Sequence, residues 1–317
     1  MICTTCQTEA RRFGKDRKGN QRFQCLTCKK TFSEPHAKTL PGMILDEEKI
    51  ISVLKHLVEG CSIRSTERIT GVEKRTILSI IQKVGDKCEA LTDRMIQGVS
   101  VKEVQCDEIW GFVGMKEKTK NRQGKGDDDG LGDAYCFIAM ERHTKLILAW
   151  HLGRRTANDT YVFTERLARA TADHNFDVYT DGFKPYRDAM VYSLGAKLVN
   201  FGQLIKQYGK LVDDDHRYSP AEVVGVEKLA IFGEPDLDKV CTSHIERQNL
   251  TVRMSMRRMT RLTNAFSKKW WNLRCAYALQ FAYYNFCRVH KTLRVTPAME
   301  AKLTDHVWDL KELLYSA

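Results

Sequence analysis

The sequence lacks several features that would place it in common classes of protein. No apolar run approaches the roughly 20 residues that a membrane-spanning helix needs, so a membrane protein is not expected. The first residues do not show a basic segment followed by an apolar one, so a secretory signal is not expected either. There are no internal repeats and no low-complexity tracts. We therefore expect a cytoplasmic protein associated with the nucleoid.

Acidic residues are missing from one long segment. Between Arg247 and Arg294 the sequence has eleven Lys or Arg and no Asp or Glu, whereas the remainder holds 40 residues of each sign. The net charge is +11. A basic excess of this kind favours polyanionic partners, and nucleic acid is the most common of these. The alternative is a solvated basic helix that has no such partner.

The chain has eleven cysteines, and without an export signal we do not expect disulfide bonds. Seven of them are scattered among apolar neighbours and are interpreted as small core residues. The other four form two Cys-x2-Cys pairs separated by 18 residues, Cys3 with Cys6 and Cys25 with Cys28. This spacing is typical of a zinc ribbon, in which four thiolates complete the tetrahedron that zinc prefers. A redox role is the weaker alternative, because neither pair lies in a βαβ context.

Residues 1–40 are therefore predicted to be a zinc ribbon. Its core would be too small for the segment to fold alone, so structural Zn²⁺ would supply folding energy. Residues 44–98 are predicted to form a helix-turn-helix domain, because apolar residues recur at helical spacing from Asp46, over 62–70 and over 73–91. The alternative is a trihelical packing module with a solvated charged face. The third helix would offer these contacts to DNA: Lys74, Arg75, Thr76, Ser79 and Lys83.

Beyond residue 99 the pattern predicts alternating strands and helices. Strands are expected at 101–113, 134–139, 146–152, 176–180 and 196–201, with helices at 158–172, capped by Asn158, and from Pro185. Residues 116–133 are expected to be a hairpin loop and residues 202–243 a long irregular insertion of unassigned role. From Ser243 the chain is expected to be mostly helical, with Trp270 and Trp271 in its core. The fold class predicted for the whole chain is multidomain α+β.

Three acidic residues stand out by their surroundings. Asp107 lies in an apolar strand, where an ionised carboxylate is costly unless it is compensated. Asp181 ends an apolar strand, where ligands of α/β folds commonly bind, and Glu246 opens the basic segment. If the three meet, divalent cations would be needed to balance them. Because side chains alternate along a strand, we expect Asp107 and Glu108 to point oppositely, so that only one joins the site.

Two rival acidic clusters occur, at residues 127–129 and 213–215. Both lie in loop-like surroundings without flanking strands, and a solvated loop explains them better.

Three short strings resemble a known family: Cys-Asp-Glu-Ile-Trp at 106–110, Thr-Asp-Gly-Phe-Lys-Pro-Tyr at 180–186 and Ile-Glu-Arg-Gln-Asn at 245–249. With the cysteine pairs and the helical segment, they are similar to the DDE transposases of the insertion sequence 1 type over nearly the whole chain. The resemblance implies a ribonuclease H-like catalytic domain at 99–317, with a triad that binds Mg²⁺ or Mn²⁺. The triad would be Asp107, Asp181 and Glu246.

The resemblance also implies a basic residue seven positions after the glutamate, which here is Arg253. On a helix this spacing places Arg253 on the face of Glu246, where it could hold a DNA phosphate. Arg257, Arg258 and Arg261 are further candidates for phosphate contacts. The 64 residues between Asp181 and Glu246 depart from the simplest cores of this kind, and the excess coincides with the predicted insertion.

The function expected from these features is that of a DNA transposase. It would bind the terminal inverted repeats of an insertion sequence in double-stranded DNA, as a homodimer or higher oligomer, and would catalyse metal-dependent strand cleavage and transfer. One alternative is a non-catalytic DNA-binding regulator, which does not explain the acidic residues in their strand contexts, or a domesticated transposase relic. Another alternative is a ribonuclease H-like nuclease that acts on structured DNA. Cleavage that does not depend on the terminal-repeat sequence would favour this alternative.

Overall fold

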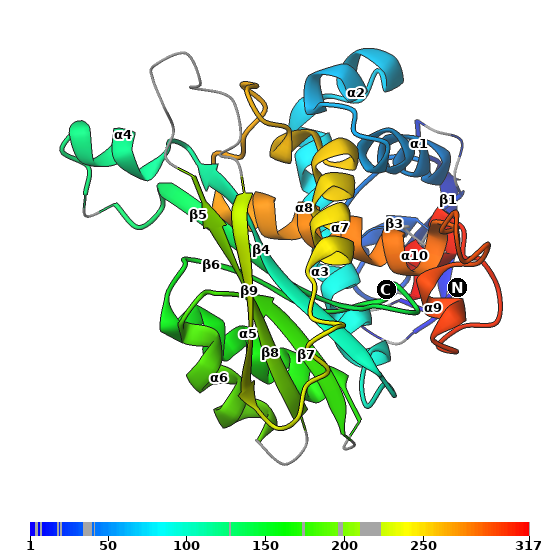
Figure 1. Cartoon of the computed structure of the whole chain (residues 1–317). Helices are drawn as coiled ribbons and strands as arrows, with labels where there is room; N and C mark the ends of the chain where they lie inside the picture. Colours follow the sequence, from blue (N-terminus) through cyan, green and yellow to red (C-terminus); the bar gives the residue numbers. More distant parts are fainter. Residues whose placement is uncertain are drawn as a thin grey trace. The chain divides into compact units, whose positions relative to one another are not determined.

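The computed structural model describes residues 1–3, 6, 8–17, 19, 21–33, 40, 42–126, 128–172, 175–195, 199–209 and 223–316. These residues form two compact units, Met1–Glu47 and Glu48–Ala317, which are described separately (Figure 1).

The first unit contains a small antiparallel sheet. Its strands are β1 (Ala10–Lys15), β2 (Gln21–Cys25) and β3 (Thr31–Ser33), in the order β1-β2-β3. Phe23 is buried and its ring stacks on Phe32 at 6.2 Å between centroids. Few other apolar side chains are buried in the described part of this unit, so packing alone supplies little folding energy.

The second unit is built on a six-stranded mixed sheet in the order β6-β5-β4-β7-β8-β9 (Figure 1). Neighbours pair in antiparallel fashion except at β4–β7 and β7–β8, which are parallel. Six ranges define the strands: β4 Glu103–Val113, β5 Gly132–Glu141, β6 Ile147–Gly153, β7 Phe176–Asp181, β8 Val199–Tyr208 and β9 Val223–Phe232.

The strands that follow β4 in the sequence lie first on one side of it in the sheet and then on the other. The chain first forms β5 and β6, then crosses through α5 (Ala157–Ala170) to β7, and α6 (Pro185–Leu194) leads on to β8. The neighbours β4 and β7 therefore form the point from which the connections run in opposite directions. In α/β sheets, ligands bind outside the carboxyl ends of the strands at such a point.

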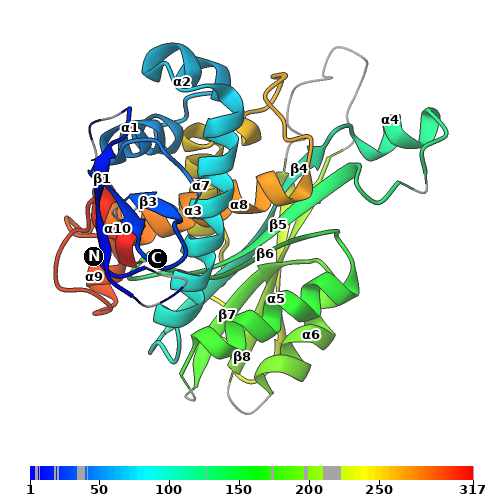
Figure 2. The same cartoon turned by 180° about the vertical axis from the view of Figure 1, so that it is seen from behind.

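Helices cover both faces of this sheet. On one face lie α5 and α6, where Phe137 of β5 packs against Phe163 and Tyr186 at centroid distances of 5.6 and 6.4 Å (Figure 2). On the other face lie α7 (Ser243–Ser255) and α8 (Trp270–Ala282), and Trp150 of β6 packs against Phe281 of α8 at 5.6 Å. The apolar core is thus divided into two layers by the sheet.

Three helices precede the sheet in the second unit: α1 (Glu47–Val58), α2 (Ile63–Thr70) and α3 (Lys74–Met95). The Ser62 hydroxyl caps α2, and Gly71 ends it in a left-handed conformation, which agrees with the helix predicted over 62–70. Helix α3 lies along α8, and its buried Glu89 pairs with Arg274 of α8 at 2.7 Å and with Arg166 of α5 at 3.2 Å. The domain boundary near residue 98 stays a prediction.

Several local predictions need correction. In the predicted insertion at 202–243, residues 202–208 belong to β8 and residues 223–232 to β9, while residues 210–222 lie outside the described part. The predicted loop at 116–133 contains α4 (Glu117–Arg122), in which Lys120 pairs with Glu117 at 3.1 Å. Thr156, rather than Asn158, caps α5, because its hydroxyl accepts the amide proton of Asp159. Trp271 is 48% exposed and does not belong to the core.

The end of the chain is mostly helical, as expected. Beyond α8 come a short π-helix (Tyr283–Cys287), α9 (Pro297–Glu300) and α10 (Leu310–Ser316), while a 3-10 turn (Arg257–Met259) follows α7. A search of the described helices finds none that combines the length and the apolar character needed to cross a membrane.

Candidate functional site

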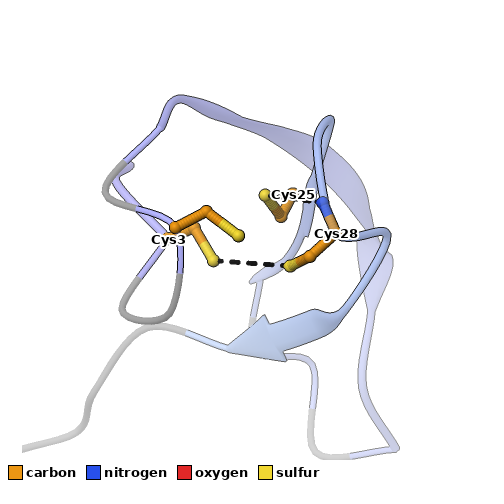
Figure 3. A group of neighbouring side chains, drawn as sticks. Cys3, Cys25 and Cys28 are labelled. Atoms are coloured by element: carbon orange, nitrogen blue, oxygen red, sulfur yellow. Dashed lines mark hydrogen bonds between the residues drawn. The ribbon is translucent and has the colours of Figure 1, made fainter.

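Among the described residues, two groups of three or more side chains could hold a metal ion. The first is the cysteine box at the N-terminus, in which one ligand atom from each residue lies within 4.8 Å of the others: Cys3, Cys6, Cys25 and Cys28. Two cysteines come from the segment before β1, and the other two from the end of β2 and the turn that follows. Figure 3 shows the side chains of Cys3, Cys25 and Cys28 directed toward a common centre.

The cysteines of this box are free thiols that form no disulfide bond. The Sγ atoms of Cys3 and Cys28 are 3.8 Å apart, much more than the length of a disulfide bond. The hydroxyl of Thr8 and the amide of Cys28 lower the pKa of Cys25 to about 5, which favours its thiolate. Cys6 shows the opposite effect, because its hydrogen bond to Cys28 raises its pKa to about 12. Four cysteine sulfurs gathered within 4.8 Å of one another form a donor set that fits zinc.

The second group consists of Asp107, Glu108 and Asp181, whose carboxylate oxygens lie within 4.8 Å of one another. Asp107 and Glu108 are consecutive residues of β4, and Asp181 is the last residue of β7. The group therefore lies just beyond the last paired residues of the two parallel strands, in the middle of β4 and at the carboxyl end of β7. The structure thus brings together Asp107 and Asp181, as predicted, and adds Glu108.

Asp107 and Glu108 do point to opposite faces of the sheet. Asp107 is paired with Ile138 and accepts a hydrogen bond of 2.7 Å from Asn249 of α7, whereas Glu108 is paired with Phe137, whose ring packs against α5 and α6. The expectation that only one of them can join the site is nevertheless wrong.

The reason is a split in the sheet. The pairing of β4 with β7 ends at Gln105 and Tyr179, while β4 continues along β5 to Val113. Beyond Gln105 no strand of the described chain pairs with this edge of β4. Side chains from both faces can therefore turn into the split and approach Asp181.

Burial and mutual repulsion raise the pKa values of the acidic group. Burial, followed by the charge of Asp181, raises the pKa of Asp107 to about 7 and that of Glu108 to about 8. Arg155 offsets part of this charge, because its guanidinium donates to Glu108 at 3.1 Å and to Asp181 at 3.5 Å. The Asp181 side chain is 40% exposed, so the group is open to solvent on one side.

Glu246 is not one of the three residues that meet. Its carboxylate is paired with Lys206 of β8 and accepts a hydrogen bond of 2.7 Å from Thr242. It is close enough to raise the pKa of Asp107, although less than burial and Asp181 do. The third member of the predicted triad therefore borders the acidic group, on the first turn of α7.

The basic residues after Glu246 have different surroundings. Arg253 is half-buried and donates to the backbone carbonyls of Met259 and Trp110, both at 3.0 Å, and burial lowers its pKa. Arg258 donates to Ser267 and to the carbonyl of Asn272, and burial lowers its pKa to about 10.

The structure thus places the guanidinium of Arg258 within the protein, which contradicts its selection as a phosphate contact. Arg257 and Arg261 are exposed.

The residues proposed to contact DNA from the third helix lie near the start of α3. Lys74 and Arg75 are exposed, whereas Thr76, Ser79 and Lys83 are half-buried. Of the rival acidic clusters, Asp128 and Asp129 are exposed, and Asp127 and residues 213–215 lie outside the described part of the chain.

Comparison with protein-family models and with curated proteins finds no match for this chain. Four residues of the site did not emerge from the sequence as candidates: Glu108, Arg155, Lys206 and Asn249. Asn249 is the last residue of the Ile-Glu-Arg-Gln-Asn string, and this location is the feature of the sequence that could have identified it as a site residue. Arg155 and Lys206 carry no local signal, because the acidic side chains that they contact are distant in the sequence.

Proposed function

We propose that the chain is a DNA transposase that uses divalent metal ions to cleave DNA strands and join them to new sites. The observation that carries the proposal is the convergence of Asp107 and Glu108, from the middle of β4, with Asp181, at the end of β7. Carboxylates in that position are hard oxygen donors, which suit Mg²⁺ or Mn²⁺. The chain around them is basic and offers exposed arginines for a polyanion.

The residues at this site fit a divalent cation by their chemistry. Three carboxylates compete for the charge of one guanidinium, and a buried oxygen of Glu108 has no hydrogen-bond partner among the described residues. When bound, divalent ions at such a site activate the attacking oxygen and stabilise the leaving oxygen of a phosphodiester. Asp107 and Asp181 would hold the ions, and Glu246 would complete the site after exchanging Lys206 for an ion.

In this proposal, the other residues orient the reactants. Asn249 donates to Asp107 and fixes the direction of its carboxylate. Arg257 and Arg261 would contact DNA phosphates, whereas Arg253 would support the site through the carbonyl of Trp110, on the same strand as Asp107. Phosphoryl transfer of this kind needs positioning and charge stabilisation, with no covalent enzyme intermediate.

The same proposal assigns roles to the rest of the chain. A ribonuclease H-like domain would contain the mixed sheet, and the acidic residues on β4, at the end of β7 and on α7 support this. The first turn of α3, with exposed Lys74 and Arg75, would contact DNA as part of a helix-turn-helix. The zinc-bound box would be a second DNA contact, and the active species would be a homodimer or higher oligomer on the terminal repeats.

The test is strand cleavage of a labelled duplex that carries the element's own end, in Mg²⁺. The intact chain is expected to cleave it, and Asp181→Asn and Glu246→Gln are expected to bind the duplex without cleaving it. Glu227→Gln is the matched control, because Glu227 is an exposed acidic residue of β9 outside the site. Cleavage by the Asp181 variant at the rate of the intact chain would contradict the assigned site.

One observation favours a second candidate, a non-catalytic DNA-binding regulator. Glu246 is held by Lys206 and Thr242 rather than by the acidic group. Specific binding of the element end without cleavage in either Mg²⁺ or Mn²⁺ would favour that candidate.

A further inference from the structure

Glu108 is a buried carboxylate whose interactions are incomplete. Its side chain is only 3% exposed. One oxygen, Oε2, accepts a hydrogen bond from Arg155, whereas Oε1 is buried without a hydrogen bond in the described part of the chain. The hydroxyl of Tyr186, which is also buried without a partner there, is close enough to lower the pKa of this carboxyl. A buried acceptor without a partner costs on the order of 1–3 kcal/mol, and more if it is charged. Such a cost suggests that a ligand completes the site.

The position of Glu108 indicates what that ligand is. Its carboxylate reaches the group from the face of the sheet covered by α5 and α6, and Asp107 reaches it from the face covered by α7. Asp181 approaches from the end of the neighbouring strand. Three carboxylates thus surround one point from three directions, which is the arrangement expected around a hard cation rather than around an anion or an apolar group.

The positive charges near this point do not balance the three carboxylates, so a divalent ion could be accommodated. Arg155 is held in place by the ring of Phe183, with its guanidinium 4.2 Å from the centroid, and it contributes one positive charge. Lys206 contributes to the potential at Asp107, but it is itself paired with Glu246. When ionised, the three carboxylates carry three negative charges against the single positive charge of Arg155, and a doubly charged ion would balance this excess.

We propose that Glu108 is a direct ligand of the divalent cation, together with Asp107 and Asp181. Arg155 is a positioning residue that keeps Glu108 and Asp181 together before the ion enters. The site then has four acidic residues, because Glu246 borders it from α7. This inference rests on the proposed metal-dependent function, and the two can fail separately.

The experiment is a calorimetric titration of the full-length, zinc-loaded chain with Mn²⁺, in the absence of DNA. Glu108→Gln keeps the shape of the side chain and removes one potential anionic ligand, so its affinity for Mn²⁺ is expected to fall at least tenfold. Glu227→Gln is the control and is expected to bind as the intact chain does. Asp181→Asn is the positive reference and is expected to lose affinity at least as strongly.

A second variant distinguishes the loss of a metal ligand from a loss of folding. Glu108→Asp keeps the charge and shortens the side chain by one methylene, so it is expected to fold and to bind Mn²⁺ more weakly than the intact chain. The melting temperature provides a second readout, since a ligand stabilises the folded state according to its concentration and affinity. Saturating Mn²⁺ is expected to raise the melting temperature of the intact chain, with a smaller rise for both Glu108 variants.

Two results separate this inference from the proposed function. If Mn²⁺ affinity depends on Glu108 but no DNA is cleaved, the metal site stands and the transposase proposal fails. If DNA is cleaved and both folded Glu108 variants bind Mn²⁺ as tightly as the intact chain, the inference about Glu108 is overturned. Glu108 would then be a structural acid held by Arg155.

Discussion

Replacing Gly85 with alanine tests how closely α3 approaches α8. In an exposed helix this change would stabilise the protein by about 1 kcal/mol, because alanine has the higher helix propensity. At Gly85, however, the new Cβ would lie 2.5 Å from both the Cα and the carbonyl oxygen of Cys275. Since both atoms belong to the backbone of α8, no side-chain rotation can relieve the contact.

The expected effect is therefore the difference between two opposing contributions. Overpacking costs about 1–3 kcal/mol, and the upper end applies because the backbones must separate by roughly 1 Å. After subtraction of the helix propensity, we expect a destabilisation of about 2 kcal/mol. At an unfolding entropy of about 2.1 cal/mol/K per residue, that corresponds to a fall in melting temperature of roughly 3 °C.

The assay is thermal unfolding of the zinc-loaded chain, followed by circular dichroism. Gly126→Ala is the matched control, because the nearest atom to its new Cβ is the side-chain oxygen of Asn121 at 3.8 Å, and we expect almost no change there. Cys275→Gly should not rescue Gly85→Ala, since Cα and the carbonyl oxygen remain. A melting temperature that rises in Gly85→Ala would refute the close approach of the two helices.

Four further predictions concern other parts of the chain. Cys28→Ser is expected to abolish the binding of one zinc ion per chain, measured by elemental analysis, and retention of that ion would contradict the four-cysteine site. Arg257→Gln should lower the slope of log affinity for DNA against log salt by about 0.9 without changing stability. Its neighbour behaves differently: Arg258→Ala should lower the free energy of unfolding by about 2–4 kcal/mol, because a buried side chain and its hydrogen bonds are lost. Burial lowers the pKa of His151, so protonation favours the unfolded chain as the pH falls through about 6.5. Acidification from about pH 7.5 to about pH 5.5 should therefore destabilise the intact chain more than His151→Gln, and equal losses would contradict this assignment.

The elements that the sequence predicts well are those with local signals. The apolar run of β7 ends in Asp181-Gly182, and α2 is bounded by Ser62 and Gly71, so a few adjacent residues define each boundary. The pair β8–β9 has no such signal. Its residues alternate irregularly in polarity, and its pairing spans the segment 210–222, so only the neighbouring strand identifies it.

The candidate site divides in the same way. The strand contexts of Asp107 and Asp181 were sufficient to single out both residues, whereas their meeting was implied by the resemblance to a known family. The inclusion of Glu108 was not predictable, because the alternation rule describes where a side chain begins and not where a longer one ends. Whether Glu108 can turn into the split depends on where β4 and β7 stop pairing, and that is a tertiary property.

Burial of neighbouring arginines is equally invisible in the sequence. Arg257 and Arg258 are adjacent and chemically identical, yet one is exposed and the other donates to Ser267 and Asn272. The 3-10 turn at Arg257–Met259 determines which of the two faces inward.

The continuity of α3 has a mechanical consequence. A helix from Lys74 to Met95 is about 33 Å long at 1.5 Å per residue, and it has no break along that length. Because its buried middle is in contact with α8 and with α5 through Glu89, its exposed first turn cannot rotate independently of the sheet. A ligand gripped by that first turn would be presented to Asp107 and Asp181 at a set distance and angle. The length of the helix would then fix the distance between the place where the ligand is bound and the place where it reacts.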